Sequence, residues 1–94
     1  MRSPLFRVQV IGPSMEPALP SGTLLWARRG GVRAGRLVVF AEPGRPELVV
    51  IKRATRREGE GWWVEGDNRE VSIDSRHYGP IDHAAVLGTI IGRR

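Results

Sequence analysis

The sequence predicts an all-β fold, either a small β-barrel or twisted sheets, with at most one or two short helical turns. Three observations favour this fold. Short apolar segments rich in β-branched residues recur at intervals of about ten residues. Glycine (12) and proline (7) make up one fifth of the 94 residues and separate these segments. No stretch carries the apolar period of a long helix. The length suits one domain, which we expect to span residues 1–94.

We expect six strands in this fold. They lie at residues 5–11, 23–27, 36–41, 47–56, 62–65 and 87–91. The first alternates apolar and polar side chains, as a strand with one covered face does, and it ends at Gly12 and Pro13. The fourth is the longest and is β-branched and apolar at its centre. A glycine-rich turn at residues 58–61 joins it to the fifth strand as a hairpin.

The segments between these strands are predicted to be largely irregular. Two prolines limit residues 14–20 to a turn or one short helical turn. Residues 66–80 have no regular apolar period and many turn-forming residues. Asp82 is suited to cap a single helical turn over residues 83–86.

The composition excludes several classes of protein. A hydrophobic share of 40% and a charged share of 27% are typical of a globular chain. No apolar run approaches the length of a membrane span, so we expect no span in this chain. Residues 1–7 lack the apolar core and cleavage site of a signal peptide, which predicts a chain neither exported by the general route nor anchored. The absence of cysteine excludes disulfides, thiolate zinc sites and cysteine nucleophiles.

Lys52 is the only lysine among fifteen basic residues, in a chain with a net charge of +5. Lysine, unlike arginine, loses its proton when it is desolvated. Lys52 is therefore a candidate for chemistry that needs a neutral amine, although a single lysine also arises by chance. Its face of the predicted strand carries Leu48, Val50 and Ala54 and no acid. Burial there would lower the pKa of the amine from its ordinary value near ~10.4 toward that of a general base.

Ser14 follows the first predicted strand on a Gly-Pro corner. A turn at this place exposes a side chain at the sheet edge, and its free backbone N–H groups suit an oxyanion. Ordinary turn chemistry also explains such a serine. Beside a neutral lysine, a serine forms a nucleophile–base pair that needs no histidine. The polar segment 66–76 is by itself typical of a solvated loop.

Three segments, taken in order, resemble the type I signal peptidases and related Ser–Lys serine proteases. Residues 10–19 (VIGPSMEPAL) are similar to the nucleophile segment of that family. Residues 50–53 (VIKR) are similar to its lysine segment, and residues 66–76 (GDNREVSIDSR) to its glycine-aspartate-asparagine segment. Residues 37–40 resemble the short apolar segment between them. The resemblance runs from residue 8 to the end of the chain and implies a β-barrel or twisted sheets of the signal-peptidase and repressor-protease type.

The resemblance implies a catalytic role for two residues and a supporting role for four more. Ser14 would attack the scissile carbonyl, with its own amide N–H as one oxyanion donor. Lys52 would take the serine proton and later protonate the leaving amine. Ser72 would hold the lysine amine by a hydrogen bond. The segment around it would be braced by an ion pair and a further acid: Asp74 with Arg76, and Asp67.

The resemblance also implies how a substrate binds. It would lie as an added strand between residues 8–11 and the strand that leads to Lys52. Shallow pockets for small side chains would be lined by Val10, Met15, Leu19, Val50 and Ile51. An exposed apolar rim around the serine would consist of Leu5, Phe6, Met15 and Leu19.

Two departures from the family pattern bear on function. Gly12 stands where some members carry a hydroxyl that assists the oxyanion, so we expect a weaker oxyanion hole. We expect the chain to lack the membrane anchor and second β-domain of longer relatives, and in this respect it resembles the small anchorless proteases of nickel-type superoxide dismutase maturation. We therefore expect a cytoplasmic endopeptidase that removes an N-terminal leader from a precursor protein and needs no cofactor.

Three alternatives remain open. A type I signal peptidase core without its anchor would use the same chemistry at a membrane. A self-cleaving repressor-type domain is disfavoured, because only thirteen residues precede Ser14. A β-barrel that binds nucleic acid would use arginines together with Trp62 and Trp63, but interspersed acids count against it, so no nucleic acid is expected. His77 and His83 lack a third partner at metal-ligand spacing, so no metal site is expected.

Overall fold

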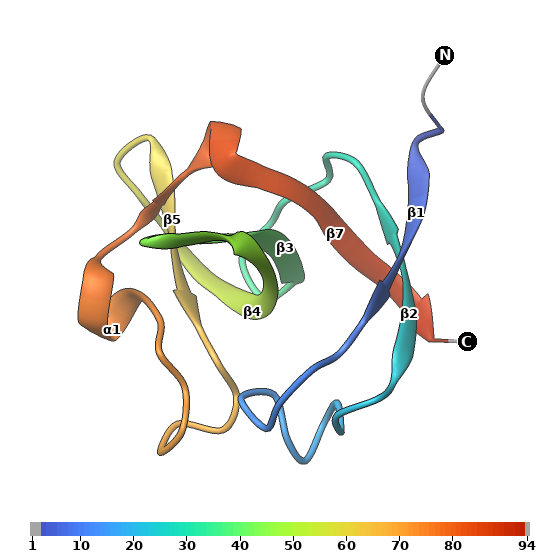
Figure 1. Cartoon of the computed structure of the whole chain (residues 1–94). Coiled ribbons are helices and arrows are strands. Elements are labelled where there is room, and N and C mark those ends of the chain that lie inside the picture. Colours follow the sequence, from blue (N-terminus) through green and yellow to red (C-terminus); the bar gives the residue numbers. More distant parts are fainter. Residues whose placement is uncertain (1–2, 94) are drawn as a thin grey trace.

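The computed structural model describes residues 3–93, which form one antiparallel sheet of seven strands. The strands are β1 (Leu5–Gln9), β2 (Leu24–Arg28), β3 (Leu37–Glu42), β4 (Arg45–Glu58), β5 (Gly61–Glu65), β6 (Ile81–Asp82) and β7 (Val86–Arg93). Their order across the sheet is β1-β2-β7-β3-β4-β5-β6. The sheet is strongly curled, and its β1–β2 and β5–β6 ends lie on opposite sides of the molecule (Figure 1). The predicted all-β fold is confirmed.

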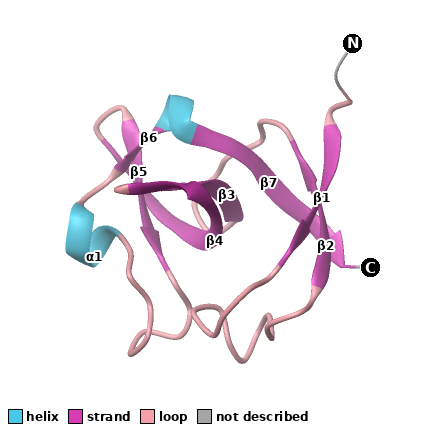
Figure 2. Cartoon of the chain, viewed as in Figure 1, coloured by secondary structure: helices cyan, strands magenta, loops and turns pink. Residues whose placement is uncertain are grey.

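In the described part of the chain, helix is confined to two single turns, coloured cyan in Figure 2. They are α1 (Ser75–Tyr78) and a 3₁₀ turn, η1 (His83–Ala85). The expected helical turn after Asp82 is therefore present, although the Asp82 side chain makes no capping hydrogen bond. The sequence missed α1 and the two-residue strand β6, which are both too short to show a period. No helix within residues 3–93 is long and apolar enough to cross a bilayer.

Strands β3 and β4 separate two apolar cores. The first core consists of Val10, Met15, Leu19, Leu25, Ala27, Val39 and Ile51. The second core consists of Val38, Phe40, Ala54, Trp62, Val64 and Ile81. Because successive side chains of a strand point to opposite faces, β3 and β4 supply residues to both cores. Burial on both faces explains why these two strands carry continuous apolar runs rather than an alternating pattern.

Two loops meet at one end of the curled sheet, at the bottom of Figure 1. The first, residues 10–23, joins β1 to β2 and carries Ser14. The second, residues 66–74, joins β5 to α1. The backbone N–H of Asn68 donates to the carbonyl of Ser14 at 2.8 Å, and its side-chain amide donates to the carbonyl of Pro13 at 3.0 Å. These bonds fix the Ser14 turn against the second loop.

Candidate active site

Lys52 lies in the middle of β4 with only 3% of its surface exposed. It pairs across the sheet with the fully buried Val38 of β3. Its Nζ donates a hydrogen bond to Ser72 Oγ at 3.1 Å. Within residues 3–93 no carboxylate lies within 4 Å of this amine. A buried lysine without an ion pair is rare, because desolvation of the ammonium is costly.

The pKa of Lys52 is lowered from its ordinary value. Burial is the main cause, because it penalises the charged ammonium. The negative charges of Asp74 and Glu42 act in the opposite direction, and the positive charge of Arg76 adds to the lowering. The amine is therefore neutral at a lower pH than the amine of a free lysine.

Asp74 is fully buried and accepts five hydrogen bonds. Two come from the guanidinium of Arg76, at 2.9 and 2.6 Å, and one from the hydroxyl of Ser72 at 2.7 Å. Backbone N–H groups of Gly66 and Arg76 donate the others, at 2.8 and 3.1 Å. Burial alone would raise the pKa of Asp74, but these hydrogen bonds outweigh it and hold the pKa well below its usual range. The carboxylate stays charged.

Asp74 also starts α1 and so fixes the segment that carries Ser72 and Arg76. Its side chain accepts from the backbone N–H of Arg76, and its own N–H donates to Nδ1 of His77 at 3.2 Å. This reciprocal arrangement is a capping box. The hydroxyl of Ser75 accepts from the backbone N–H of Val64 at 2.8 Å and ties the turn to β5. The short helix thereby holds the partner of Lys52 in one place.

Ser14 lies in the loop after β1, in a groove between that loop and β4. Of the predicted pocket residues, Val10, Met15, Val50 and Ile51 line this groove together with Ser14. Within residues 3–93 the amine of Lys52 donates to Ser72, and no hydrogen bond joins it to Ser14 Oγ. The loop that carries Ser14 and the loop that carries Ser72 both approach Gly66 closely.

Leu19 does not line the groove. It is 6% exposed and packs in the first core, beneath the groove. The prediction of an exposed apolar rim around Ser14 is wrong for Met15 and Leu19. Both are buried core residues, and Met15 is only 1% exposed. Leu5 is exposed and Phe6 is half-buried. A loop closed by two prolines turns its apolar residues inward, and sequence spacing alone does not show this.

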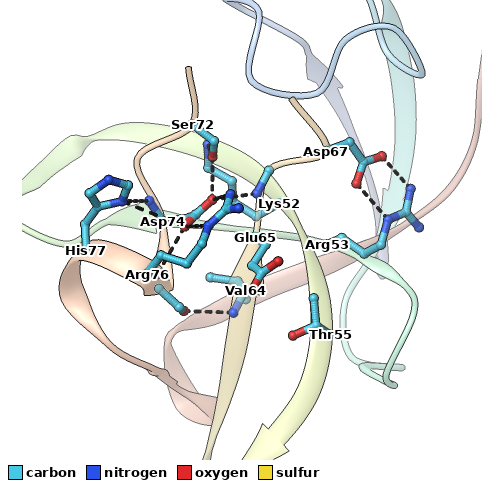
Figure 3. Close-up of polar contacts among 12 residues, drawn as sticks. Lys52, Arg53, Thr55, Val64, Glu65, Asp67, Ser72, Asp74, Arg76 and His77 are labelled. Carbon is cyan, nitrogen blue, oxygen red and sulfur yellow. Dashed lines mark hydrogen bonds and ion pairs between the residues drawn. The ribbon is translucent and has the colours of Figure 1, made fainter. Parts of the chain in front are cut away.

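Asp67 is not part of the Lys52 cluster. Its carboxylate forms two hydrogen bonds with the guanidinium of Arg53, at 2.9 and 2.8 Å, and these raise the pKa of Arg53 (Figure 3). Its backbone N–H contacts the sulfur of Met15 at 3.3 Å. The sequence analysis missed Arg53, although Arg53 directly follows Lys52 and must point to the opposite face of β4. Asp67 thus supports the loop from the side of β4 that faces away from Lys52.

Gly66 lies between the two loops that carry Ser14 and Ser72. A methyl group there would overlap the side chain of Ser72 and approach the carbonyl oxygen of Ser14 to 2.8 Å. Its N–H donates to Asp74. Only glycine allows the loops to approach this closely. The sequence offered one signal for this role, since Gly66 opens the third motif.

We expect Gly66→Ala to push the Ser14 and Ser72 loops apart. The overlap should lower the free energy of unfolding by about 1–3 kcal/mol, and the displacement should lower peptidase kcat/KM by about 100-fold. Thermal unfolding and peptide cleavage measure the two effects. The matched control is Gly92→Ala in β7, where an added methyl group meets nothing within 4 Å. Equal stability and equal kcat/KM of Gly66→Ala and Gly92→Ala would contradict this role of Gly66.

The tryptophan pair of β5 does not form a stacking platform. Trp62 is 6% exposed and lies in the second core, where its Nε1 donates to Nδ1 of His83 at 2.9 Å. Trp63 is half-buried, with the guanidinium of Arg56 4.5 Å above its ring. This arrangement removes the main support for the nucleic-acid alternative.

The sequence is similar to known proteases over most of its length. Residues 1–91 match the family model described as Peptidase S24-like. Mitochondrial inner membrane protease subunit 1 of Mus musculus is 30% identical over 108 residues, which cover 88% of this chain and 65% of the mouse protein; the Homo sapiens protein gives the same figures. Subunit 2 from Schizosaccharomyces pombe is 29% identical over 106 residues, which cover 85% of this chain and 59% of that protein. The chain thus spans less than two thirds of the length of these relatives.

The fold and these similarities together define the class, which is that of signal-peptidase-like serine proteases. Within that class, the chain belongs to the Peptidase S24-like family.

Proposed function

We propose that the chain is a serine endopeptidase in which Ser14 is the nucleophile and Lys52 the general base. The observation that carries this proposal is the direction of the hydrogen bonds around Lys52. Ser72 donates its proton to the charged Asp74, so its oxygen only accepts from the lysine. The lone pair of the neutral amine is then free for another proton. Asp74 is neutralised by Arg76 and does not require the lysine as a counterion.

The reaction follows from these positions. Ser14 Oγ attacks the scissile carbonyl carbon while Lys52 Nζ accepts the hydroxyl proton. The resulting ammonium gives this proton to the leaving amine as the C–N bond breaks, which leaves an acyl-enzyme. Water then attacks the ester while Lys52 again accepts a proton, and Lys52 returns this proton to Ser14 Oγ as the ester C–O bond breaks and the acid product leaves. The amide N–H of Ser14 is the proposed oxyanion donor. The contact between Ser14 Oγ and the amine forms once substrate is bound, since such contacts are often long in free enzymes.

A substrate would bind as an extended strand in the groove beside Ser14. Strand β1 is the first strand of the sheet and pairs only with β2 among the described strands, so its other edge offers backbone groups to a peptide. The groove is lined on its other side by Val50 and Ile51 of β4. Its apolar wall at Ser14 suits a small side chain in the residue before the cut.

The proposed substrate is a precursor protein with an N-terminal leader, and the resemblance favours the precursor of nickel-type superoxide dismutase in the cytoplasm. The alternative is a precursor cut at a membrane, as by a signal peptidase core. The names of the relatives, inner membrane proteases, support that alternative. Both substrates require the same chemistry at Ser14 and Lys52.

We expect the purified chain to cut one of these two precursors after a small residue. Leader-bearing nickel superoxide dismutase and a signal-peptide-bearing protein are incubated in parallel, and the new N-terminus is read by mass spectrometry. Leucine or tryptophan in place of the residue before the cut should slow cleavage by more than about tenfold, because the pocket is shallow. The control is Ser14→Ala with the same precursors. Cleavage by that variant, or indifference to the residue before the cut, would contradict the proposal.

A further inference from the structure

The groove at Ser14 continues along β1 into a second hollow. The hollow that contains Ser14 and the second one share Gln9 and Val49 in their walls. The second hollow lies toward the start of β1, where its walls include Phe6, Val8 and Leu87. Val49 and Leu87 are about half exposed (50% and 42%). The two hollows therefore form one continuous path for an extended chain.

The second hollow has a positive charge without a counterion. Arg29 lines it, with the guanidinium 5.0 Å from the centre of the Phe6 ring. Its Nε donates to the carbonyl of Ser3 at 3.3 Å, and within residues 3–93 the other N–H groups of the guanidinium make no hydrogen bond or ion pair. Neither hollow has an aspartate or glutamate in its lining. Stacking on Phe6 holds the planar group in place, which lowers the entropic cost of binding a carboxylate.

A second arginine in the same wall does not share this position. Arg7 follows Phe6 on β1, so their side chains leave opposite faces of the strand. The guanidinium of Arg7 lies 5.1 Å from the Trp26 ring, on its partner strand β2. Arg29 is therefore the arginine whose guanidinium lies against another residue of the second hollow, Phe6.

We propose that Arg29 is a specificity residue that binds an acidic side chain of the substrate upstream of the cut. The inference rests on the proposed function, in which the residue before the cut fills the pocket at Ser14. Val10 in that pocket directly follows β1 and lies four residues after Phe6, which is about 13 Å at a rise of about 3.3 Å per extended residue. In the proposed binding mode the substrate runs parallel to β1, and an extended chain then places the acid about four residues upstream of the residue in the pocket.

The test is a series of fluorogenic peptides that differ at one position. A glutamate is moved stepwise through the six residues upstream of the cut, and each peptide has a matched glutamine peptide. We expect kcat/KM to be about three- to tenfold higher for glutamate than for glutamine near the fifth residue upstream of the cut and equal elsewhere. The preference should fade in about 1 M salt, where the Debye length is about 3 Å.

Variants assign the preference to one side chain. Arg29→Gln should bring the glutamate-to-glutamine ratio to about one and leave cleavage of the glutamine peptide within about twofold. Arg29→Lys keeps the positive charge and should retain part of the preference for glutamate over glutamine. The control, Arg33→Gln, removes the same charge from the exposed loop after Arg29 and should keep the full ratio.

Each other outcome overturns one of the two proposals. Two results contradict the role of Arg29 while the proposed function stands. One is a kcat/KM that does not depend on the position of the glutamate, and the other is an equal fall in kcat/KM for the glutamate and glutamine peptides in Arg29→Gln. Failure to cut any peptide or precursor contradicts the proposed function. In that case the affinity of labelled glutamate and glutamine peptides, measured by fluorescence anisotropy, decides the role of Arg29 separately.

Discussion

The Lys52→Met variant is expected to lose at least about 10⁴-fold in kcat while it folds no less stably than the parent chain. Methionine has nearly the same length and fills the space on β4, but it has no proton acceptor of comparable strength. Its burial avoids the desolvation that lowers the pKa of Lys52. Cleavage of a fluorogenic peptide and thermal unfolding measure the two quantities on one preparation.

Three further variants define the role of the amine. Lys52→Arg keeps a positive charge but cannot supply a neutral base, so it should be as inactive as Lys52→Met. Ser14→Ala should be equally inactive, and the double variant Ser14→Ala with Lys52→Met should be no worse, because a nucleophile and its base act as one unit. Multiplicative losses in the double variant, or retained activity in Lys52→Arg, would exclude Lys52 as the base.

The lowered pKa of Lys52 also gives a pH dependence with a defined sign. Activity should rise with pH as the amine loses its proton, and this rise should occur below the ordinary lysine pKa near ~10.4. Between the folded and unfolded pKa values the unfolded chain binds more protons, so the free energy of unfolding rises with pH in that window. Below the folded pKa, Lys52 is protonated in both the folded and the unfolded chain, so its contribution to the free energy of unfolding no longer changes with pH. The contribution of Lys52 is measured by comparing the pH dependence of the free energy of unfolding between the parent chain and Lys52→Met.

The Asp74→Asn variant is expected to lower the free energy of unfolding by about 3–5 kcal/mol. The substitution leaves the guanidinium of Arg76 without its counterion, and an amide nitrogen replaces one of two oxygens that together accept five hydrogen bonds. In a chain of this size the midpoint of thermal unfolding should fall by at least about 12 °C. Activity should fall as well, because Ser72 loses the acceptor that fixes its hydroxyl.

The matched control for this variant is Asp67→Asn. Asp67 also accepts two hydrogen bonds from an arginine, but that pair is partly exposed and should contribute about 1 kcal/mol or less. Because the folded pKa of Asp74 is lowered, its contribution is complete above the unfolded pKa near ~3.9 and is lost as the pH falls further. Equal destabilisation by the two variants would contradict a special role for Asp74.

The sequence was sufficient to predict the strands, because each strand shows in the apolar pattern of its own residues. Six strands were expected and are present, because alternation in β1 and continuous apolar runs in β3 and β4 are set by burial of their own side chains. The contacts of Lys52, Ser72, Asp74 and Arg76 were implied by family resemblance, and the structure places these four side chains in one cluster. Their catalytic roles remain predictions.

Other features depend on contacts that a linear pattern does not contain. The burial of Met15 and Leu19 follows from how the loop after β1 folds over the first core. The pairing of Asp67 with Arg53 follows from the path of residues 66–68 across β4. Helix α1 is a single turn fixed by hydrogen bonds of Asp74 and not by an apolar period.

The proposed nucleophile and its base are held by different cores of the molecule. Ser14 is carried by a loop whose apolar side chains, Met15 and Leu19, are fixed in the first core. Lys52 lies between Val50 and Ala54, which pack with the second core, and its partners are tied to β5. Ser14 and Lys52 thus depend on different cores, and their relative position depends on how both cores pack against β3 and β4. We therefore expect substitutions that loosen either core, even far from the groove, to change the distance between Ser14 Oγ and Lys52 Nζ and so to lower activity.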